Sequence, residues 1–263
     1  MDLKLKGKKA FVSGSTQGIG FAIAQQLMNE NVAVTINGRQ PEKTEQARKK
    51  LQEQFPNTTV SAIVADFAKK KEVDDLLAQL TDIDILINNI GIFEVKDFEN
   101  ITDEDWYRYF EINVMSSVRL SRQLLPKMLN KKWGRIVFIS SESGVNVPAN
   151  MIHYGMTKSA MLAVANGLSK LTKGTEVTVN TILGGPTYSD GVAAVVEQIA
   201  EAQNLSVGEM KNAILQQSNP HSLLERFIEP NEIASLVTYL SSPLSLATNG
   251  SSLRADGGVL RTI

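Results

Sequence analysis

Two side chains four positions apart, Tyr154 and Lys158, have the types and the spacing for acid–base chemistry. The apolar residues of segment 151–171 recur at helical intervals, and positions i and i+4 lie on one face of a helix. A nearby ammonium favours the phenolate form of tyrosine and moves the phenol pKa down from about 10 toward a useful working range. Alone, this spacing equally describes a half-buried aromatic ring beside a solvated lysine.

A glycine-rich run, Ser-Gly-Ser-Thr-Gln-Gly-Ile-Gly at residues 13–20, has the composition of a phosphate-binding turn. Glycines permit positive φ and close approach of the backbone to a phosphate, and the N-terminus of a following helix favours an anion. The spacing differs from the common Gly-x-Gly-x-x-Gly pattern, and a tight turn without ligand is the alternative. The position after the first predicted strand favours a dinucleotide.

Short β-branched runs alternate with longer segments of helical period along the whole chain. Strands are predicted at 10–13, 32–36, 59–64, 83–87, 135–140 and 177–183. Helices are predicted at 19–30, from Pro41 onward, at 103–129 and at 151–171. Such alternation makes the strands parallel and covers both faces of the sheet with helices. We therefore expect an α/β fold, one doubly wound Rossmann-type parallel sheet forming a single domain over 1–263, with ligands beyond the carboxyl ends of the strands.

The composition excludes several classes of site. The 263 residues are 43% apolar and 21% charged, with a net charge of −1, which gives no electrostatic footprint for nucleic acid or an anionic membrane. There is no Cys and there are two His, so we expect no metal centre. No apolar run reaches the roughly 18 residues of a membrane helix, and the first nine residues are not a signal peptide. We expect a cytoplasmic protein.

The ordered set of motifs resembles the short-chain dehydrogenase/reductase family over nearly the whole chain. The set comprises residues 13–20, Asn88-Asn89-Ile90-Gly91, Asn113, Ser141, Tyr154 with Lys158, the segment 230–234 and Asp256-Gly257-Gly258. The resemblance implies a Rossmann enzyme that transfers hydride between a nicotinamide cofactor and a small carbonyl or alcohol substrate. It also implies a homodimer or homotetramer. A dinucleotide-binding regulatory or scaffold protein without turnover is the alternative, because fold alone does not give function.

The resemblance also implies four catalytic residues. Tyr154 would give a proton to a carbonyl in reduction and take one in oxidation, while Lys158 would hold the nicotinamide ribose and depress the Tyr154 pKa. Ser141 would polarise the substrate oxygen, with Ser140 as a strand-end hydroxyl bonded to backbone. Asn113 would support a proton relay through water, although a polar side chain inside a helix can also bond to its own turn.

For the cofactor, the resemblance implies contacts at two ends of a cleft. Residues of the glycine-rich run would bind around the pyrophosphate, namely Gly14, Ser15, Gly18, Ile19 and Gly20. Asp66 would meet the adenine, Asn89 the adenosine side and Ser189 the nicotinamide carboxamide. Three residues depart from the family pattern: Ser13 stands for Thr, Ile90 for Ala and Gly184 for Pro.

The end of the second predicted strand bears on cofactor choice. An acidic residue there would bind the ribose 2′-hydroxyl of NAD and repel a 2′-phosphate. This sequence has Gly38 followed by Arg39, whose guanidinium suits a phosphate. We expect NADP, with NAD as the alternative.

Residues 188–228 are too long for an ordinary connection of about 2 to 6 residues. Their apolar positions have partly helical spacing. A mobile substrate lid and a fixed helical pair both fit this pattern, and we expect the lid.

Overall fold

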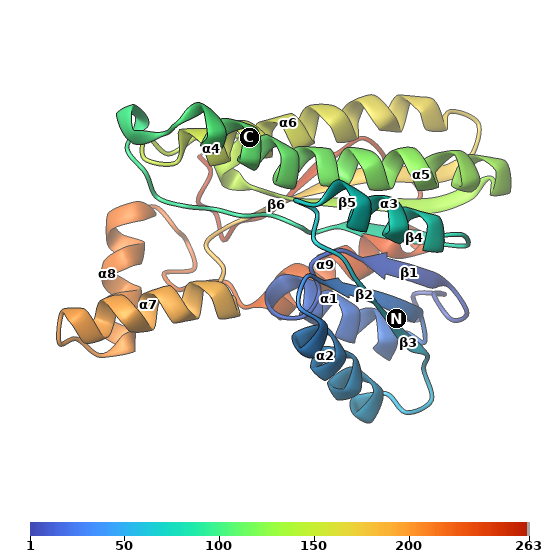
Figure 1. Ribbon diagram of the computed structural model, residues 1–263, viewed down its shortest axis with the longest axis horizontal. Helices are drawn as coiled ribbons and strands as arrows, with labels where there is room; N and C mark the ends of the chain where they lie inside the picture. Colours follow the sequence, from blue (N-terminus) through green and yellow to red (C-terminus); the bar gives the residue numbers. More distant parts are fainter. Residues whose placement is uncertain (262–263) are drawn as a thin grey trace.

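A computed structural model describes residues 1–261, and its centre is one seven-stranded sheet in which every neighbouring pair is parallel (Figure 1). The strand order is β3-β2-β1-β4-β5-β6-β7. The strands are β1 (Lys9–Val12), β2 (Ala33–Gly38), β3 (Val60–Val64), β4 (Ile85–Asn88), β5 (Trp133–Ser141), β6 (Glu176–Gly184) and β7 (Ser252–Ala255). The predicted fold class is confirmed, and each predicted strand is present. The sequence reading missed β7.

The order of the strands reverses between β1 and β4, because the chain winds outward first on one side and then on the other. At such a switch point the connections leave in opposite directions and open a crevice at the carboxyl ends of the strands. The glycine-rich run follows β1 and the Asn88-Asn89 pair ends β4, so both motifs lie at this crevice.

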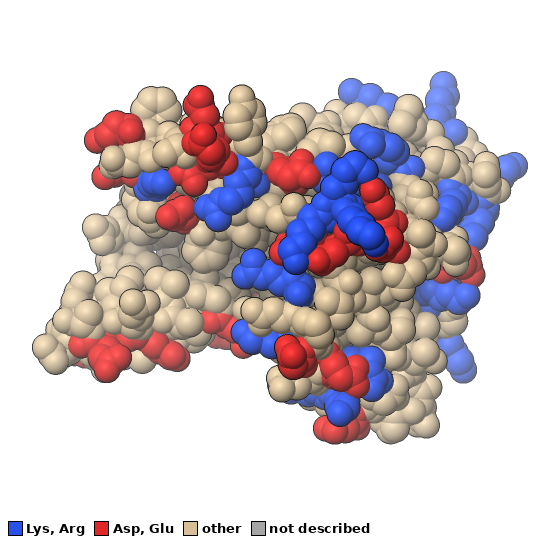
Figure 2. All heavy atoms as spheres, in the orientation of Figure 1, with Lys and Arg blue, Asp and Glu red and all other residues tan. Residues whose placement is uncertain are grey.

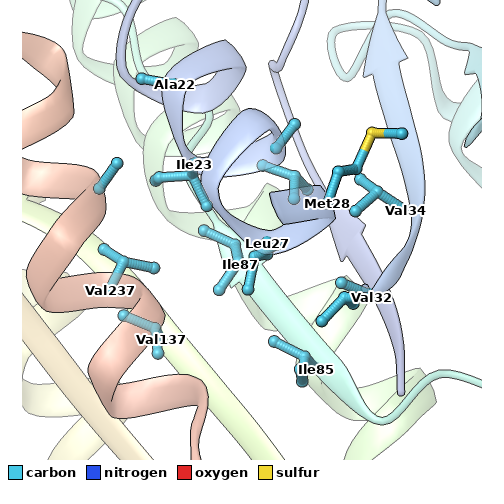
Figure 3. Close-up of a cluster of buried hydrophobic side chains, with 14 of the residues drawn as sticks. Ala22, Ile23, Leu27, Met28, Val32, Val34, Ile85, Ile87, Val137 and Val237 are labelled. Carbon is cyan, nitrogen blue, oxygen red and sulfur yellow. The ribbon is translucent and has the colours of Figure 1, made fainter. Parts of the chain in front are cut away.

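One face of the sheet is covered by α1 (Gly18–Asn29), α2 (Pro41–Gln54) and α9 (Pro230–Ser241). Figure 3 shows Ile23 and Leu27 of α1 pointing at the strands, with Val237 of α9 beside them. Alternate strand residues such as Ile85 and Ile87 complete this fully buried layer. Proline at the first position of both α2 and α9 fixes a helical φ where no N–H partner is needed.

The opposite face is covered by α3 (Lys70–Gln79), α5 (Ser116–Lys131) and α6 (Ile152–Ser169). The intervening strand residues, among them Phe11, Leu86 and Phe138, point to this side, as the two-residue period of a strand requires. Both faces of every central strand are therefore buried, which explains their continuous apolar runs.

The predicted helix over 103–129 is interrupted. It consists of α4 (Asp103–Tyr109), a π-helical turn (Phe110–Met115) and then α5. Thr102 and Asp105 form a capping box at the start of α4. A π-helical turn inserts one extra residue per turn and re-aims side chains, and such turns are frequent at functional sites.

Helices α7 (Asp190–Ala202) and α8 (Val207–Ser218) form an arm that projects away from the sheet (Figure 1, orange). They pack on each other through a small apolar cluster centred on Val196, Ala200 and Met210. Short 3-10 helices lie at Phe98–Asn100, Glu142–Gly144, Lys170–Thr172 and Pro243–Ser245. Among residues 1–261, the structure has no helix of the length and apolarity needed to span a membrane.

Candidate active site

A cleft of about 450 Å³ opens at the crevice between β1 and β4, within the size range of small-molecule sites. Figure 2 shows the surface hollowed between the arm that carries α7 and the main body. The cleft is lined by Gly14, Thr16, Gln17, Gly18, Ile19, Asn37, Gly38, Arg39, Gln40, Lys43, Ala65, Asp66, Phe67, Asn89, Ile90, Gly91, Ile92, Phe93, Ile112, Ser189 and Gly191. Most of the predicted cofactor residues are therefore brought together.

The glycine-rich turn is tight because other backbone and side chains fill its inner side. Gly14 has φ +59°, where a side chain is strained, and a Cβ on Gly20 would lie 2.5 Å from Asn89 Nδ2. Asn89 Nδ2 donates to the carbonyl oxygens of Ser13 and Gly14 at 3.1 and 2.9 Å. Asn89 thus braces the turn and also lines the cleft.

Two hydroxyls of the turn point inward rather than toward a ligand. Ser13 Oγ donates to Ile87 O at 3.1 Å and accepts from Asn89 N–H at 2.9 Å. Ser15 Oγ donates to Val12 O at 2.6 Å and accepts from Asn37 N–H at 3.0 Å. Both serines are fully buried. The side chain of Ser15 therefore stabilises the turn, and contact with a cofactor falls to the backbone and to its neighbours.

Three charged residues stand at the adenosine end of the cleft. Arg39 lies at the rim, and Lys43 in the first turn of α2 lines the same region. Within the described part of the chain neither makes an ion pair or a side-chain hydrogen bond, so both cations are available to an anion. Lys43 was not predicted as a cofactor residue. Its position two residues after Pro41, and so in the first turn of a predicted helix, could have indicated it. Asp66 lines this end too, with its carboxylate accepting from Ala68 N–H at 3.0 Å.

The candidate catalytic residues lie directly behind the other end, where Gly91 and Phe93 line the cleft. Lys158 is buried, and its Nζ donates to Ile139 O at 3.0 Å and lies 5.5 Å from the centroid of the Tyr154 ring. Phe93, which lines the cleft, packs edge-on against Tyr154 with 6.4 Å between ring centroids. A Cβ on Gly91 would lie 3.3 Å from Lys158 Nζ, so glycine keeps this end open to the ammonium.

Ser140 and Ser141, at the end of β5, point to different partners. Ser140 Oγ donates to Lys158 O at 2.9 Å and fixes α6 to the strand. Ser141 donates to the Glu142 carboxylate, accepts from Ser143 N–H at 3.1 Å and lies beside the Tyr154 phenol. The Ser140 hydroxyl is thus bonded to backbone, and the role of Ser141 toward a substrate oxygen stays a prediction.

The expected depression of the Tyr154 pKa by Lys158 is not found in this structure. Burial raises the pKa of Tyr154 well above its usual value, and the charge of Glu142 adds to that rise. Burial also lowers the pKa of Lys158 to about 8, against a smaller opposing effect of Glu142. The physical reason is that desolvation disfavours the charged form of each group, the phenolate of Tyr154 and the ammonium of Lys158.

Asn113 lies in the π-helical turn and is fully buried. Its side chain accepts from Ile92 N–H at 2.8 Å and donates to Ile92 O at 3.0 Å and to Thr157 Oγ1 at 2.9 Å. The alternative of a bond to its own helical turn is not seen. Asn113 instead holds the segment after Gly91, at the catalytic end of the cleft, against α6.

Ser189 lies beside the glycine-rich turn, since a Cβ on Gly18 would be 3.2 Å from Ser189 Cβ. Its neighbour Asp190, the first residue of α7, accepts from Gly18 N–H at 2.6 Å. Neither Asp190 nor Glu142 was a candidate from the sequence. Among residues 1–261 no group of three or more His, Asp or Glu side chains is arranged to hold a metal ion.

A family model described as short chain dehydrogenase matches residues 8–200. The chain belongs to the short-chain dehydrogenase/reductase family. It is 43% identical, over the full length of both chains, to the uncharacterized oxidoreductase YvaG of Bacillus subtilis. It is 30% identical to a D-beta-hydroxybutyrate dehydrogenase of Cupriavidus necator, with 97% of this chain and 98% of that one covered.

Among solved structures, L-sorbose reductase from Gluconobacter frateurii in complex with NADPH and L-sorbose superposes with a TM-score of 0.94. The two chains are 27% identical and each is covered completely. Membership of the family makes this chain an NAD(P)-dependent oxidoreductase that acts on a small-molecule substrate. The cleft suits such a cofactor, because it has a glycine-rich turn for a pyrophosphate and free cations at one end. At the other end, Lys158 and Tyr154 lie behind the lining residues Gly91 and Phe93.

Proposed function

We propose that this protein transfers hydride between NADP and a carbonyl/alcohol pair, with Tyr154 as the acid/base. The observation that carries the proposal is that Tyr154 packs against Phe93 and Lys158 lies beside Gly91. Phe93 and Gly91 both line one end of the cleft, and Ser141 lies next to Tyr154. A protein that only senses a dinucleotide needs the glycine-rich turn and Arg39. It has no need of a half-buried tyrosine and a buried lysine beside a strand-end serine.

The proposed roles follow from what each side chain can donate or accept. The bound nicotinamide supplies or accepts the hydride. In reduction, the raised pKa keeps the Tyr154 phenol protonated and able to give its proton to the substrate oxygen. Ser141 holds the same oxygen with a hydrogen bond. Lys158, whose pKa of about 8 leaves it mostly charged at neutral pH, binds ribose hydroxyls and stabilises the phenolate that forms.

The preference for NADP rests on the two free cations at the adenosine end. Arg39 and Lys43 offer a fork of donors and a point charge to a 2′-phosphate, and Gly38 leaves no carboxylate to repel it. NADPH in the related L-sorbose reductase supports the same cofactor. NAD remains the alternative.

We also propose that residues 188–228 act as a substrate lid of the single domain. The arm has its own apolar cluster, so it can move as a unit. It contacts the glycine-rich turn through Asp190 and begins beside Ser189. Tyr188 also packs edge-on against Phe227 with 5.7 Å between ring centroids, which ties the two ends of the segment together. Closure would exclude water from the hydride transfer.

The family resemblance supports assembly as a homodimer or homotetramer. Sedimentation velocity of the purified protein distinguishes these from a monomer, for which a single species of about 29 kDa would be seen.

The deciding experiment is a panel of carbonyls and alcohols followed at the nicotinamide absorbance with NADPH, NADP, NADH and NAD. Turnover of one ketone or alcohol, faster with the phosphorylated cofactor, is expected. Tight cofactor binding without turnover across the panel would favour the non-catalytic alternative, a dinucleotide-binding regulatory or scaffold protein.

A further inference from the structure

The residue after Ser141 is a glutamate whose side chain folds back on it. Glu142 begins the 3-10 helix Glu142–Gly144, and its carboxylate accepts from the hydroxyls of Ser141 and Ser143, the latter at 3.1 Å. Ser141 Oγ also accepts from Ser143 N–H at 3.1 Å. The three residues form a closed set of hydrogen bonds at the catalytic end of the cleft.

Counting protons in this set shows a conflict with the role of Ser141. A serine hydroxyl has one proton and two lone pairs. When Glu142 is ionised, the proton of Ser141 goes to its carboxylate, and Ser143 N–H occupies one lone pair. Ser141 then has no proton left for a substrate oxygen.

A protonated Glu142 removes the conflict. Its own O–H donates to Ser141 Oγ, and the hydroxyl of Ser141 rotates to donate to the substrate oxygen. We propose that Glu142 is a positioning residue whose protonation state decides where Ser141 directs its proton, and that the neutral acid is the form competent for carbonyl reduction. Glu142 keeps its proton through the reaction, while Tyr154 supplies the proton transferred. The inference rests on the proposed function.

The surroundings of Glu142 favour the neutral acid. Burial is the largest influence and raises the pKa of Glu142, against smaller lowering effects of the hydrogen bonds from Ser141 and Ser143. The titratable groups that face it are Tyr154 and Lys158, both on α6. A negative Glu142 raises the pKa of the Tyr154 phenol, which disfavours the phenolate produced by proton transfer. The neutral acid avoids this penalty as well.

The sign of the pH dependence follows. Because the protonated form is competent, kcat for reduction is expected to fall as pH rises through the raised pKa of Glu142. Glu142→Gln replaces the acid O–H with an amide N–H that still donates to Ser141, at any pH. The Gln variant should lack this fall, so the ratio of its kcat to that of the wild type should grow about tenfold per pH unit above the pKa. A fall in kcat caused by deprotonation of Lys158 would be seen in both the wild type and the Gln variant.

Ser143→Ala is the matched second variant. It removes one hydrogen bond that stabilises the ionised carboxylate and leaves Ser141 and Glu142 in place. The fall in kcat should therefore move to higher pH, whereas simple damage to the site would lower kcat at every pH. NADPH affinity, measured by fluorescence titration, should be the same in all three proteins.

In the kinetics, two outcomes would overturn the inference: pH profiles of kcat with the same shape for wild type and Glu142→Gln, or a Ser143→Ala profile that does not move. If Tyr154→Phe retained full activity, the proposed function would fail instead.

Infrared difference spectra of the NADPH-bound enzyme test the protonation state of Glu142 without turnover. We expect the wild type to show a protonated-carboxyl band at pH values above the ordinary glutamate pKa of about 4.3. The band should be absent in Glu142→Gln. Absence of the band from the wild type would contradict the inference.

Discussion

Gly18 and Asp190, 172 residues apart in the sequence, are joined by a hydrogen bond of 2.6 Å from the backbone N–H of Gly18 to the carboxylate of Asp190. Gly18 is the first residue of α1, where unpaired N–H groups and the helix dipole favour an anion. The carboxylate from the arm therefore occupies part of the position that the family resemblance gives to the cofactor pyrophosphate. We therefore expect binding of the dinucleotide to displace it.

Removing this carboxylate is expected to strengthen cofactor binding. Asp190→Ala should raise NADPH affinity, because no bond to Gly18 has to be broken first. A hydrogen bond to a charged group is worth about 1.5 to 3 kcal/mol, which sets an upper limit of roughly ten- to more than a hundredfold. Isothermal titration measures the change in NADPH affinity. Asp190→Asn keeps a hydrogen-bond acceptor without the charge, so its affinity should lie between those of the wild type and Asp190→Ala. Weaker binding by Asp190→Ala would show that Asp190 supports the bound state.

The same contact governs the proposed lid. In the free protein, amides of 188–228 should exchange hydrogen faster in Asp190→Ala than in the wild type, and NADPH with substrate should slow exchange in both. Strong protection of the whole segment in the free wild type, unchanged by ligands, would identify α7 and α8 as a rigid part of the domain.

Arg39 and Lys43 are expected to separate the two cofactors. Arg39→Ala should weaken NADPH binding by roughly ten- to more than a hundredfold, because a charge-assisted contact with the 2′-phosphate is lost, and should change NADH binding little. Lys43→Ala should also weaken NADPH binding, but by a smaller factor, since an ammonium cannot make the bidentate contact of a guanidinium. Titration with both nucleotides is the measurement. Equal losses for NADPH and NADH would assign Arg39 a structural role.

Lys158 should cost stability at neutral pH. Burial lowers its pKa from 10.5 to about 8, so the folded state binds this proton less readily than the unfolded state. Above pH 10.5 Lys158 is neutral in both states and carries no charge-burial penalty. As pH falls from 10.5 to about 8, the unfolded state takes up the proton first and the folded state loses stability relative to it. Lys158→Met should raise the free energy of unfolding at pH 7 by up to roughly 3 kcal/mol, less the value of the lost bond to Ile139 O.

Denaturant unfolding at pH 7 and pH 10 tests this expectation. The gain of Lys158→Met should shrink at pH 10, where the lysine is largely neutral in the folded wild type. A variant less stable than the wild type at pH 7 would mean that the Ile139 bond outweighs the cost of burying the charge.

The sequence predicted the sheet because the strands are apolar throughout and the helices amphipathic, and both patterns are local. It missed β7, whose residues Ser252–Ala255 are half exposed and whose pairing with β6 is a long-range contact. It also predicted one helix at 103–129, since a single inserted residue at the π-helical turn barely changes the apolar period.

Site residues could be predicted where their type, spacing and order along the chain are specific to one kind of site. Tyr154 with Lys158 and the glycines of residues 13–20 are examples. Glu142 and Asp190 were missed because an acidic residue at a helix start is ordinarily a surface cap. Only the fold brings Asp190 to Gly18, and although Glu142 adjoins Ser141 in the sequence, only the structure shows its carboxylate turned back onto the Ser141 hydroxyl. The direction of the Tyr154 pKa was also mistaken, because spacing reveals the neighbouring ammonium but not the extent of burial.

The central claim is that Tyr154 transfers the proton, and Tyr154→Phe tests it most directly. The ring and its packing against Phe93 remain, and only the hydroxyl is removed. With a substrate from the panel, kcat should fall by about 10² to 10⁴, the usual contribution of a general acid, while the Kd for NADPH stays within error of the wild type. A Phe variant with near wild-type kcat would contradict the account.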